Sequence, residues 1–330
     1  MVTDAPVALR AVLDAAHGGR WTSLSGGGRE WLWSRPGTGR DAVAPGDDFV
    51  DAGGLEECLP TVRGLPDHGD LWSRPWQRSP AEVGFGGGPG RLMTGGGPGR
   101  LVADDGPVRL VAHGEGTGAP ADLREPTYPG GVMTIARPAF TLTRRVGEHS
   151  GAIVADYTLA ADPGHRFVWA AHALLDLSTA ARLDAPDGTT TRLYPEAAPL
   201  LAEPWPDDLP WREGPWPAPA GLALDRFGPD DGTALGAILT DCPTVHVTDG
   251  PDRLTLHLDC DGQPRSTALW RNLRGWPQPG PYRSIGVEPM LGAAFDLAGA
   301  GPGDTATVPA SGQVSWRLTI TAHRRGGTTP

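Results

Sequence analysis

The sequence predicts an all-β fold, a large antiparallel β-sandwich with few short helices. Apolar residues alternate with polar ones in many short segments, and these segments recur about a dozen residues apart, the spacing of a sandwich. The 48 glycines and 35 prolines of the chain separate these segments as turn residues. No stretch has the periodicity of a long amphipathic helix; only 178–184 and 290–298 suggest a short helical turn.

Composition favours a folded chain over a disordered one. Hydrophobic residues make up 39% of the 330 residues, and 12 tryptophans are enough to build a sizeable core. No linker separates independent parts of the chain. We therefore expect a single domain over residues 1–330.

The N-terminal region reads as paired strands followed by a loop. Residues 7–33 alternate between apolar and polar positions, with glycine clusters as turns. Residues 34–64 have few periodic apolar positions and predict a long loop over one face. Long ordered loops on a β scaffold commonly carry binding groups.

A direct repeat of Gly-Gly-Gly-Pro-Gly-Arg-Leu occupies residues 86–101. Its short period excludes a solenoid or propeller repeat. It also lacks the Gly-Lys-Ser/Thr ending of a phosphate-binding loop. The repeat predicts a Gly/Pro-rich hairpin loop.

Alternating segments continue through the middle of the chain, at 108–112, 140–144, 153–159, 167–172, 234–239, 244–248, 253–259 and 267–272. A Pro/Trp-rich excursion at 195–220 interrupts them. Its three indoles, Trp205, Trp211 and Trp216, either cover the core or form a wall of a cleft. We expect this excursion to be poor in strands.

The C-terminal region carries the most informative residue. Arg283–Gly292 reads as an apolar strand that delivers Glu288 and is stopped by Pro289. A second alternating strand follows at 314–320. A glutamate at the end of an apolar strand that faces a cleft is where a general base is expected.

Charge and targeting features exclude several classes of function. A net charge of -11 argues against a nucleic-acid partner. No apolar run approaches 18 residues, which predicts no membrane span, and the first residues lack the basic start and apolar run expected of a secretory signal. Three widely spaced cysteines (Cys58, Cys242 and Cys260) fit reduced thiols in the cytoplasm.

Two histidine segments, taken with Glu288, resemble a known family. His68 lies in Leu65-Pro-Asp-His-Gly-Asp-Leu-Trp72, after Gly53-Gly-Leu-Glu-Glu-Cys-Leu-Pro-Thr61, and His172 lies in Phe167-Val-Trp-Ala-Ala-His172. The order of these segments is similar to that of the galactose mutarotase (aldose 1-epimerase) superfamily, in its divergent mutarotase-like branch. The resemblance extends from about Val7 to Ala322.

The resemblance implies a two-sheet sandwich whose concave face holds His68, His172 and Glu288. It implies an isomerase that acts on a sugar hemiacetal without cofactor or metal. Glu288 would be the base and His172 the acid; His68 would hold a substrate oxygen or assist protonation. The partner would be a small-molecule carbohydrate or glycoside, and the protein a monomer or homodimer.

Substrate contacts are expected from Arg74, Trp270 and Asn272, with Trp72 or Trp76 as further aromatic surfaces under a sugar ring. The sequence departs from the family around His172, where alanines and leucines replace amide and aromatic residues. Galactose is therefore not the expected substrate. Whether Arg74, Arg271, Arg274 and Arg283 form a phosphate-binding cluster stays open.

Two other classes of function compete with this interpretation. The same scaffold could bind a carbohydrate without turnover, or catalyse another isomerase, cyclase or lyase reaction in specialised metabolism. Two histidines and Glu288 would also make a metal triad on paper, but their wide separation in sequence does not support one. Glu56 and Glu57 are expected to be a solvated acidic pair.

Overall fold

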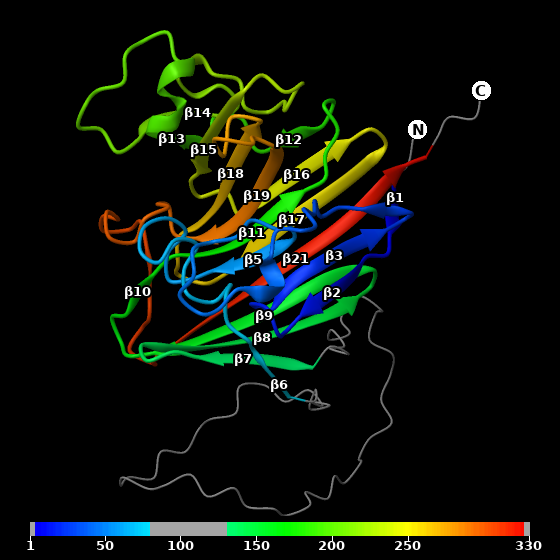
Figure 1. The fold of residues 1–330 in the computed structure, drawn as a ribbon, viewed down its shortest axis with the longest axis vertical. Coiled ribbons are helices and arrows are strands. Elements are labelled where there is room, and N and C mark those ends of the chain that lie inside the picture. The colour runs from blue at the N-terminus through cyan, green and yellow to red at the C-terminus, as the bar shows by residue number, and fades with distance from the viewer. Residues whose placement is uncertain (1–3, 80–130, 327–330) are drawn as a thin grey trace, which may run out of the picture. The chain divides into compact units, whose positions relative to one another are not determined.

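The computed structural model describes residues 4–79 and 131–326, all of which fall in one compact unit. They form two large antiparallel sheets and a small pair, β10 (Arg166–Phe167) with β20 (Ala306–Thr307) (Figure 1). This confirms the predicted all-β sandwich. The hairpin loop at 86–101 and the strand at 108–112 lie outside the described residues. The single domain over 1–330 stays a prediction.

One sheet, which we name the cavity sheet, has the strand order β14-β13-β15-β18-β19-β11-β5-β3-β2, with β4 beside β3. Its strands are β2 (Arg10–Asp14), β3 (Arg20–Gly26), β4 (Arg29–Glu30), β5 (Leu55–Cys58), β11 (Trp169–Leu175), β13 (Thr190–Leu193), β14 (Arg212–Pro215), β15 (Thr233–Leu239), β18 (Arg265–Leu273) and β19 (Arg283–Leu291).

The second sheet has the order β12-β16-β17-β21-β9-β8-β7-β6, with β1 beside β21. Its strands are β1 (Asp4–Val7), β6 (Gln77–Ser79), β7 (Val132–Ala136), β8 (Phe140–His149), β9 (Ala152–Ala161), β12 (Arg182–Asp184), β16 (Thr244–Asp249), β17 (Asp252–Asp259) and β21 (Gln313–Arg325). The described helices are three short 3-10 turns, η1 (Arg40–Ala42), η3 (Pro195–Leu200) and η4 (Pro219–Gly221).

Period-two alternation builds the core between the sheets. Along β21, Val314, Trp316, Leu318 and Ile320 are buried on one side, as the sequence predicts. Trp316 stacks on Tyr157 of β9 with ring centroids 5.1 Å apart. The core is thus aromatic where the two sheets face each other.

The core also holds a buried ion pair. Glu57 and Arg144 are fully buried, and Arg144 Nη1 donates to Glu57 Oε1 at 2.5 Å. The Tyr157 hydroxyl and the Trp169 indole donate to the same carboxylate at 2.8 and 2.7 Å. The expectation that Glu56 and Glu57 are solvated is therefore wrong. Both faces of the central strand β5 are covered, so consecutive residues such as Glu56 and Glu57, which point to opposite faces, are both buried.

Several local expectations also differ from the structure. β19 runs through Pro289, because its pairing with β11 keeps one register on both sides: Ala170 lies opposite Met290, and Leu174 opposite Gly286. Segment 178–184 contains β12, and 290–298 contains the end of β19 and no described helix. Segment 34–64 contains η1 and β5 besides the expected loop. Excursion 195–220 contains β14, η3 and η4.

Candidate active site

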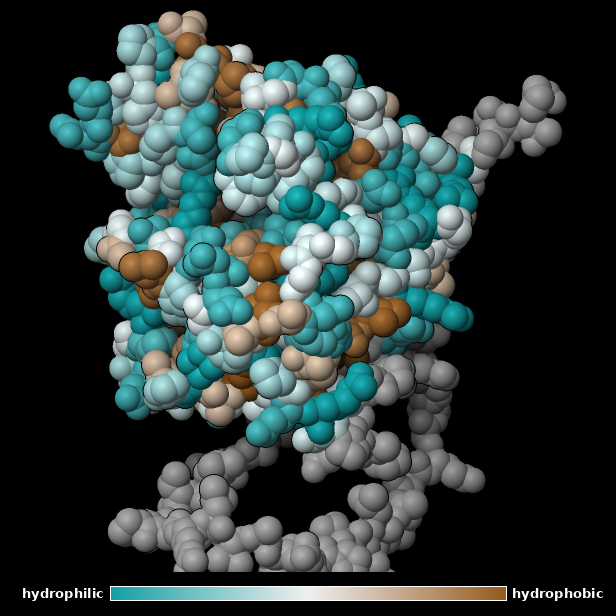
Figure 2. Space-filling view, in the orientation of Figure 1, coloured by the Kyte–Doolittle hydropathy of each residue, from teal (hydrophilic) through white to brown (hydrophobic). Residues whose placement is uncertain are grey.

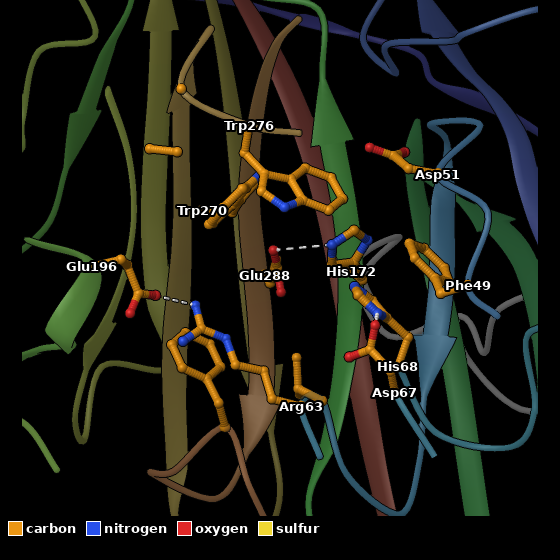
Figure 3. Close-up of a pocket in the computed structure, with 14 residues that line it drawn as sticks. Phe49, Asp51, Arg63, Asp67, His68, His172, Glu196, Trp270, Trp276 and Glu288 are labelled. Carbon is orange, nitrogen blue, oxygen red and sulfur yellow. Dashed lines mark ion pairs between the residues drawn. The ribbon is translucent and has the colours of Figure 1, made fainter. Parts of the chain in front are cut away.

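A cavity of about 540 Å³ lies on the cavity sheet, within the usual range for small-molecule sites. It is lined by Phe49, Asp51, Val62, Arg63, Asp67, His68, His172, Glu196, Ala234, Trp270, Gly275, Trp276, Glu288 and Phe295. All three predicted catalytic residues are among them, together with Trp270 (Figure 3).

His172 and Glu288 come from adjacent central strands. The register of β11 with β19 puts them opposite each other, so both side chains enter the same face of the sheet. His172 Nε2 lies 3.6 Å from Glu288 Oε1 (Figure 3). This distance is an ion-pair contact and not a hydrogen bond, so the facing atoms of both side chains remain available to a ligand.

Glycines make room for the polar side chains. A Cβ at Gly286 would lie 2.3 Å from Glu288 Oε1 and 3.0 Å from Cβ of Trp270. The Glu288 carboxylate therefore leans over the missing side chain of Gly286. Gly236 of β15 does the same for a neighbouring pair, since a Cβ there would meet Arg63 Nη2 at 2.4 Å and Glu196 Oε1 at 3.1 Å.

Burial brings the proton affinities of the two facing groups closer together. Desolvation raises the pKa of Glu288, against the opposing charges of His172 and Arg63. Desolvation also lowers the pKa of His172, against the charge of Glu288. A carboxyl and an imidazole shifted in these directions can exchange one proton at a small free-energy cost.

His68 completes the polar end of the cavity. Its ring stacks on Phe49 with centroids 3.6 Å apart and meets the His172 ring edge-on at 5.0 Å. Its Nδ1 lies 3.0 Å from Asp67 Oδ2. The backbone of His68 has a φ of 58°, a left-handed conformation that is unusual for a non-glycine residue. Contacts with Phe49, His172 and Asp67 therefore restrict the position of the His68 ring.

Burial raises the pKa of Asp67, but contacts with His68 outweigh it, and the net pKa falls below its usual value. Asp67 thus stays ionised beside His68 at neutral pH. Its carboxylate lies at ion-pair distance from Nδ1 of His68, although Nδ1 has no hydrogen-bond partner of good geometry.

Trp270 and Trp276 form the aromatic side of the cavity, with rings perpendicular and centroids 6.1 Å apart. Asn272 does not line the cavity. Its Oδ1 accepts hydrogen bonds from the backbone of Gly275 and Trp276 at 2.9 and 3.1 Å, and its Nδ2 donates to Trp276 O at 2.8 Å. Asn272 thus holds the loop that presents Trp276.

Several lining residues were missed from the sequence. Phe49, Asp51 and Arg63 come from the 34–64 segment, whose lack of periodicity had indicated a binding loop without naming its residues. Glu196 comes from the Pro/Trp excursion. The indoles of that excursion do not line the cavity, and Trp216 is buried in the core. Neither segment carries a pattern that selects one side chain over another.

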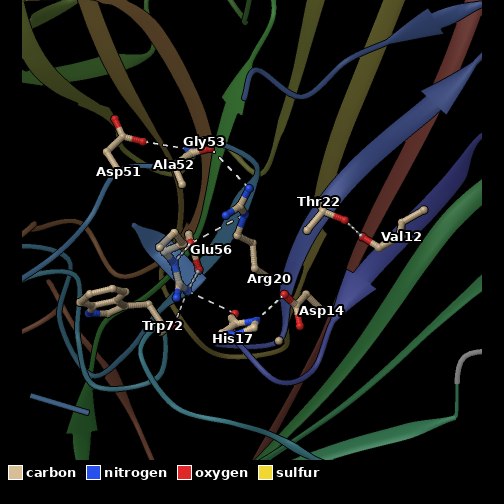
Figure 4. Close-up of polar contacts among 12 residues, drawn as sticks. Val12, Asp14, His17, Arg20, Thr22, Asp51, Ala52, Gly53, Glu56 and Trp72 are labelled. Atoms are coloured by element: carbon tan, nitrogen blue, oxygen red, sulfur yellow. Dashed lines mark hydrogen bonds and ion pairs between the residues drawn. The ribbon is translucent and has the colours of Figure 1, made fainter. Parts of the chain in front are cut away.

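Glu56 lies beside the site and is covered by the 34–54 loop. Arg40 donates to its carboxylate at 3.2 and 3.3 Å. The Arg20 side chain lies 4.0 Å from the same carboxylate (Figure 4). Burial raises the pKa of Glu56 to about 7, against the charge of Arg40. The cavity sheet therefore holds a second carboxyl of raised pKa next to the candidate site.

The remaining predicted contacts lie elsewhere. Trp72 is buried under Arg40 and touches Phe49 edge-on. Trp76 is buried with the Arg144 guanidinium 4.7 Å from its ring centroid, and Arg74 pairs with Asp70. None of the arginines considered as a phosphate cluster lines the cavity: they pair with aspartates, Arg271 with Asp231 and both Arg274 and Arg283 with Asp230.

Within residues 4–79 and 131–326, no group of three or more histidine, cysteine or acidic side chains could hold a metal ion. The helices of these segments include none long and apolar enough to cross a membrane. All three cysteines are buried free thiols.

No protein-family model matches the sequence, and no curated protein matches it significantly. Solved structures match its fold over nearly the whole chain. A provisionally assigned aldose 1-epimerase from Escherichia coli K12 is 12% identical, with a TM-score of 0.59, 98% of this chain and 100% of the other covered. A galactose mutarotase-like protein from Lactobacillus casei ATCC 334 is 14% identical, with a TM-score of 0.55, 97% of this chain and 100% of the other covered.

A galactose mutarotase related enzyme from Lactobacillus acidophilus is 13% identical, with a TM-score of 0.55. There the match covers 99% of this chain and 98% of the other. Identities this low show a common fold and leave the reaction open. The chain has the fold of the galactose mutarotase-like (aldose 1-epimerase) proteins.

Proposed function

We propose that this protein is an aldose 1-epimerase-like isomerase that interconverts the anomers of a sugar by opening and closing its hemiacetal ring. The facing pair of His172 and Glu288, 3.6 Å apart in a buried cavity, is the observation that carries this proposal. Ring opening requires one group to accept a proton and another to donate one, and this pair offers both.

The two groups have complementary roles in the proposed reaction. The Glu288 carboxylate takes the proton of the anomeric hydroxyl while His172 delivers a proton to the ring oxygen. The bond from the anomeric carbon to the ring oxygen breaks, which leaves an aldehyde and a new hydroxyl. Rotation about the adjacent bond and the reverse transfers close the ring as the other anomer, with no net gain or loss of protons.

His68 would hold a substrate oxygen beside the pair. The Phe49 ring and the Asp67 carboxylate restrict its position, so it needs little reordering when a sugar binds. Trp270 and Trp276 would cover the apolar face of the sugar ring. The chemistry consists of proton transfers and the breaking and re-forming of one carbon–oxygen bond, with no change of oxidation state, so it needs no redox cofactor.

Compartment and assembly belong to the same proposal. Three buried free thiols support a reducing compartment, which we take to be the cytoplasm. The partner is a small-molecule carbohydrate, and the working unit a monomer or homodimer.

Exchange NMR on a panel of free aldoses tests the proposal. Wild type should accelerate anomer interconversion, and Glu288→Gln and His172→Ala should each reduce kcat/KM about 10²–10⁴-fold. Glu203→Gln is the matched control, because that side chain is 78% exposed and does not line the cavity.

Circular dichroism and thermal unfolding would confirm that each variant is folded. A folded wild-type protein that accelerates no aldose would overturn the proposed reaction. Sugar binding without turnover would then favour the carbohydrate-binding alternative. Acceleration that persists in Glu288→Gln would instead reject the assigned base.

A further inference from the structure

The charge of the cavity is unbalanced. Among the described lining residues, four are carboxylates, Asp51, Asp67, Glu196 and Glu288, and one is an arginine, Arg63. The whole chain also carries a net charge of -11. The surface in Figure 2 is mostly hydrophilic, with hydrophobic residues in small groups. A low-dielectric cavity focuses such an imbalance on whatever enters it.

Arg63 is already engaged. Its Nη2 lies 2.5 Å from Glu196 Oε1, and its guanidinium lies 4.3 Å from the ring centroid of Phe295 (Figure 3). The room for this pair is created by Gly236, where a Cβ would collide with both partners. An anionic substituent would therefore compete with Glu196 for the Arg63 guanidinium.

Asp51 occupies the opposite side of the cavity. Its Oδ2 accepts a hydrogen bond from the Tyr282 hydroxyl at 2.5 Å, and its Oδ1 accepts one from Gly53 N at 3.0 Å. These bonds fix the carboxylate on the cavity wall. Arg35 lies over the Tyr282 ring, 4.2 Å from its centroid, and does not line the cavity.

Two aromatic side chains line the same cavity as Asp51. Phe49 and Trp276 both line the cavity on its side, and Trp276 is 45% exposed (Figure 3). A carboxylate with aromatic faces nearby is the usual surrounding of a bound ammonium group, since the rings attract a cation and the carboxylate pairs with it. Asp51 also acts on the facing pair, because its charge contributes to the raised pKa of Glu288.

We propose that the cavity selects its sugar by charge: it prefers a sugar that carries a protonated amino group, accepts a neutral one, and disfavours phosphorylated or carboxylated sugars. The ammonium group would lie between Asp51 and the rings of Phe49 and Trp276. This inference rests on the proposed function for its kinetic readout, and on binding for an independent one.

The kinetic test compares glucosamine, glucose, glucose 6-phosphate and glucuronate by exchange NMR. Wild type should show a kcat/KM for glucosamine roughly tenfold above that for glucose 6-phosphate, with glucose between them. Asp51→Asn should remove most of this ratio. Asp208→Asn, an exposed position in the 195–220 excursion, is the matched control and should keep it.

Glu196→Gln is the complementary variant. Loss of its charge frees Arg63, so kcat/KM for glucose 6-phosphate should rise roughly tenfold relative to glucosamine. The glucosamine preference should also shrink as ionic strength increases, because salt screens the field. Equal or higher kcat/KM for the anionic sugars in wild type would overturn the inference.

Binding separates this inference from the reaction. The methyl glycosides of glucosamine, glucose and glucuronic acid cannot open their rings, and calorimetry on wild type measures their affinities without turnover. Charge-ordered affinities without anomer interconversion would refute the reaction and retain the charge selection. Interconversion with affinities independent of charge would do the opposite.

Discussion

Glu57 and Glu288 are both buried carboxylates of the cavity sheet, but they lie on opposite faces and differ in how many partners contact them. Glu57 faces the second sheet, where Arg144, Tyr157 and Trp169 all donate to it. Glu288 faces the cavity, where its ion-pair partner among the described residues is His172, 3.6 Å away.

The difference teaches how one sheet can hold a structural and a reactive acid. A carboxylate whose oxygens are all engaged contributes to stability and has nothing left for a ligand. A buried carboxylate with a single distant partner is not compensated for its desolvation, so its pKa stays raised and it can still accept a proton. The number of donors around a buried carboxylate thus separates the two roles better than burial does.

Glu57→Gln should have the largest effect on stability. It leaves the Arg144 guanidinium buried without its counter-charge, so the free energy of unfolding should fall by about 3–5 kcal/mol. Urea unfolding followed by tryptophan fluorescence measures this change. The double variant Glu57→Gln/Arg144→Met should recover part of the loss, because it removes the unpaired charge. A single variant as stable as wild type would contradict the structural role.

Glu288→Gln should instead raise the free energy of unfolding. The pKa of this carboxyl is higher in the folded chain than its ordinary value of 4.5, so the folded state holds the proton more tightly than the unfolded state. Stability is therefore lost as pH rises through the unfolded value toward the folded one. The variant should be about 0.5–2 kcal/mol more stable than wild type at pH 7.

Below the unfolded pKa both states carry the proton and this advantage disappears. Urea unfolding at pH 7 and near pH 4 measures the sign and its pH dependence. A variant less stable than wild type at pH 7 would mean that Glu288 is a structural acid like Glu57.

Arg74→Ala should have the smallest effect. Arg74 pairs with Asp70 outside the cavity lining, so the free energy of unfolding should change by no more than about 1 kcal/mol. Anomer interconversion should be unchanged within error. A tenfold fall in kcat/KM would contradict this expectation and support the substrate contact that the sequence predicts for Arg74.

Sequence patterns predict the strands of the sandwich well. Alternation over 244–248 and 253–259 corresponds to β16 and β17, because each strand has one face in the core. The same reasoning failed at Pro289. A proline lacks one ladder donor, but it does not end a strand whose register the flanking residues maintain on both sides.

The candidate site was only partly predictable. Glu288 and His172 stand on strands whose apolar surroundings make a polar residue conspicuous. Trp72, Trp76 and Arg74 share the segment of His68, but a loop has no period that tells which side chains face the cavity. Trp76 turns to Arg144 and Arg74 to Asp70. The direction of such a loop side chain depends on packing partners that are distant in the sequence, so the local sequence does not predict it.

Gly286 couples two positions that a reader of the sequence would treat as independent. Glycine weakens a strand interior by about 0.5–1 kcal/mol relative to alanine, so β19 bears a cost here. Any Cβ at 286 would lie 2.3 Å from the present position of Glu288 Oε1. Gly286-Val-Glu288 is therefore a marker for comparing relatives. A chain with a larger residue two positions before its glutamate must orient that carboxylate differently, even where the acid itself is retained.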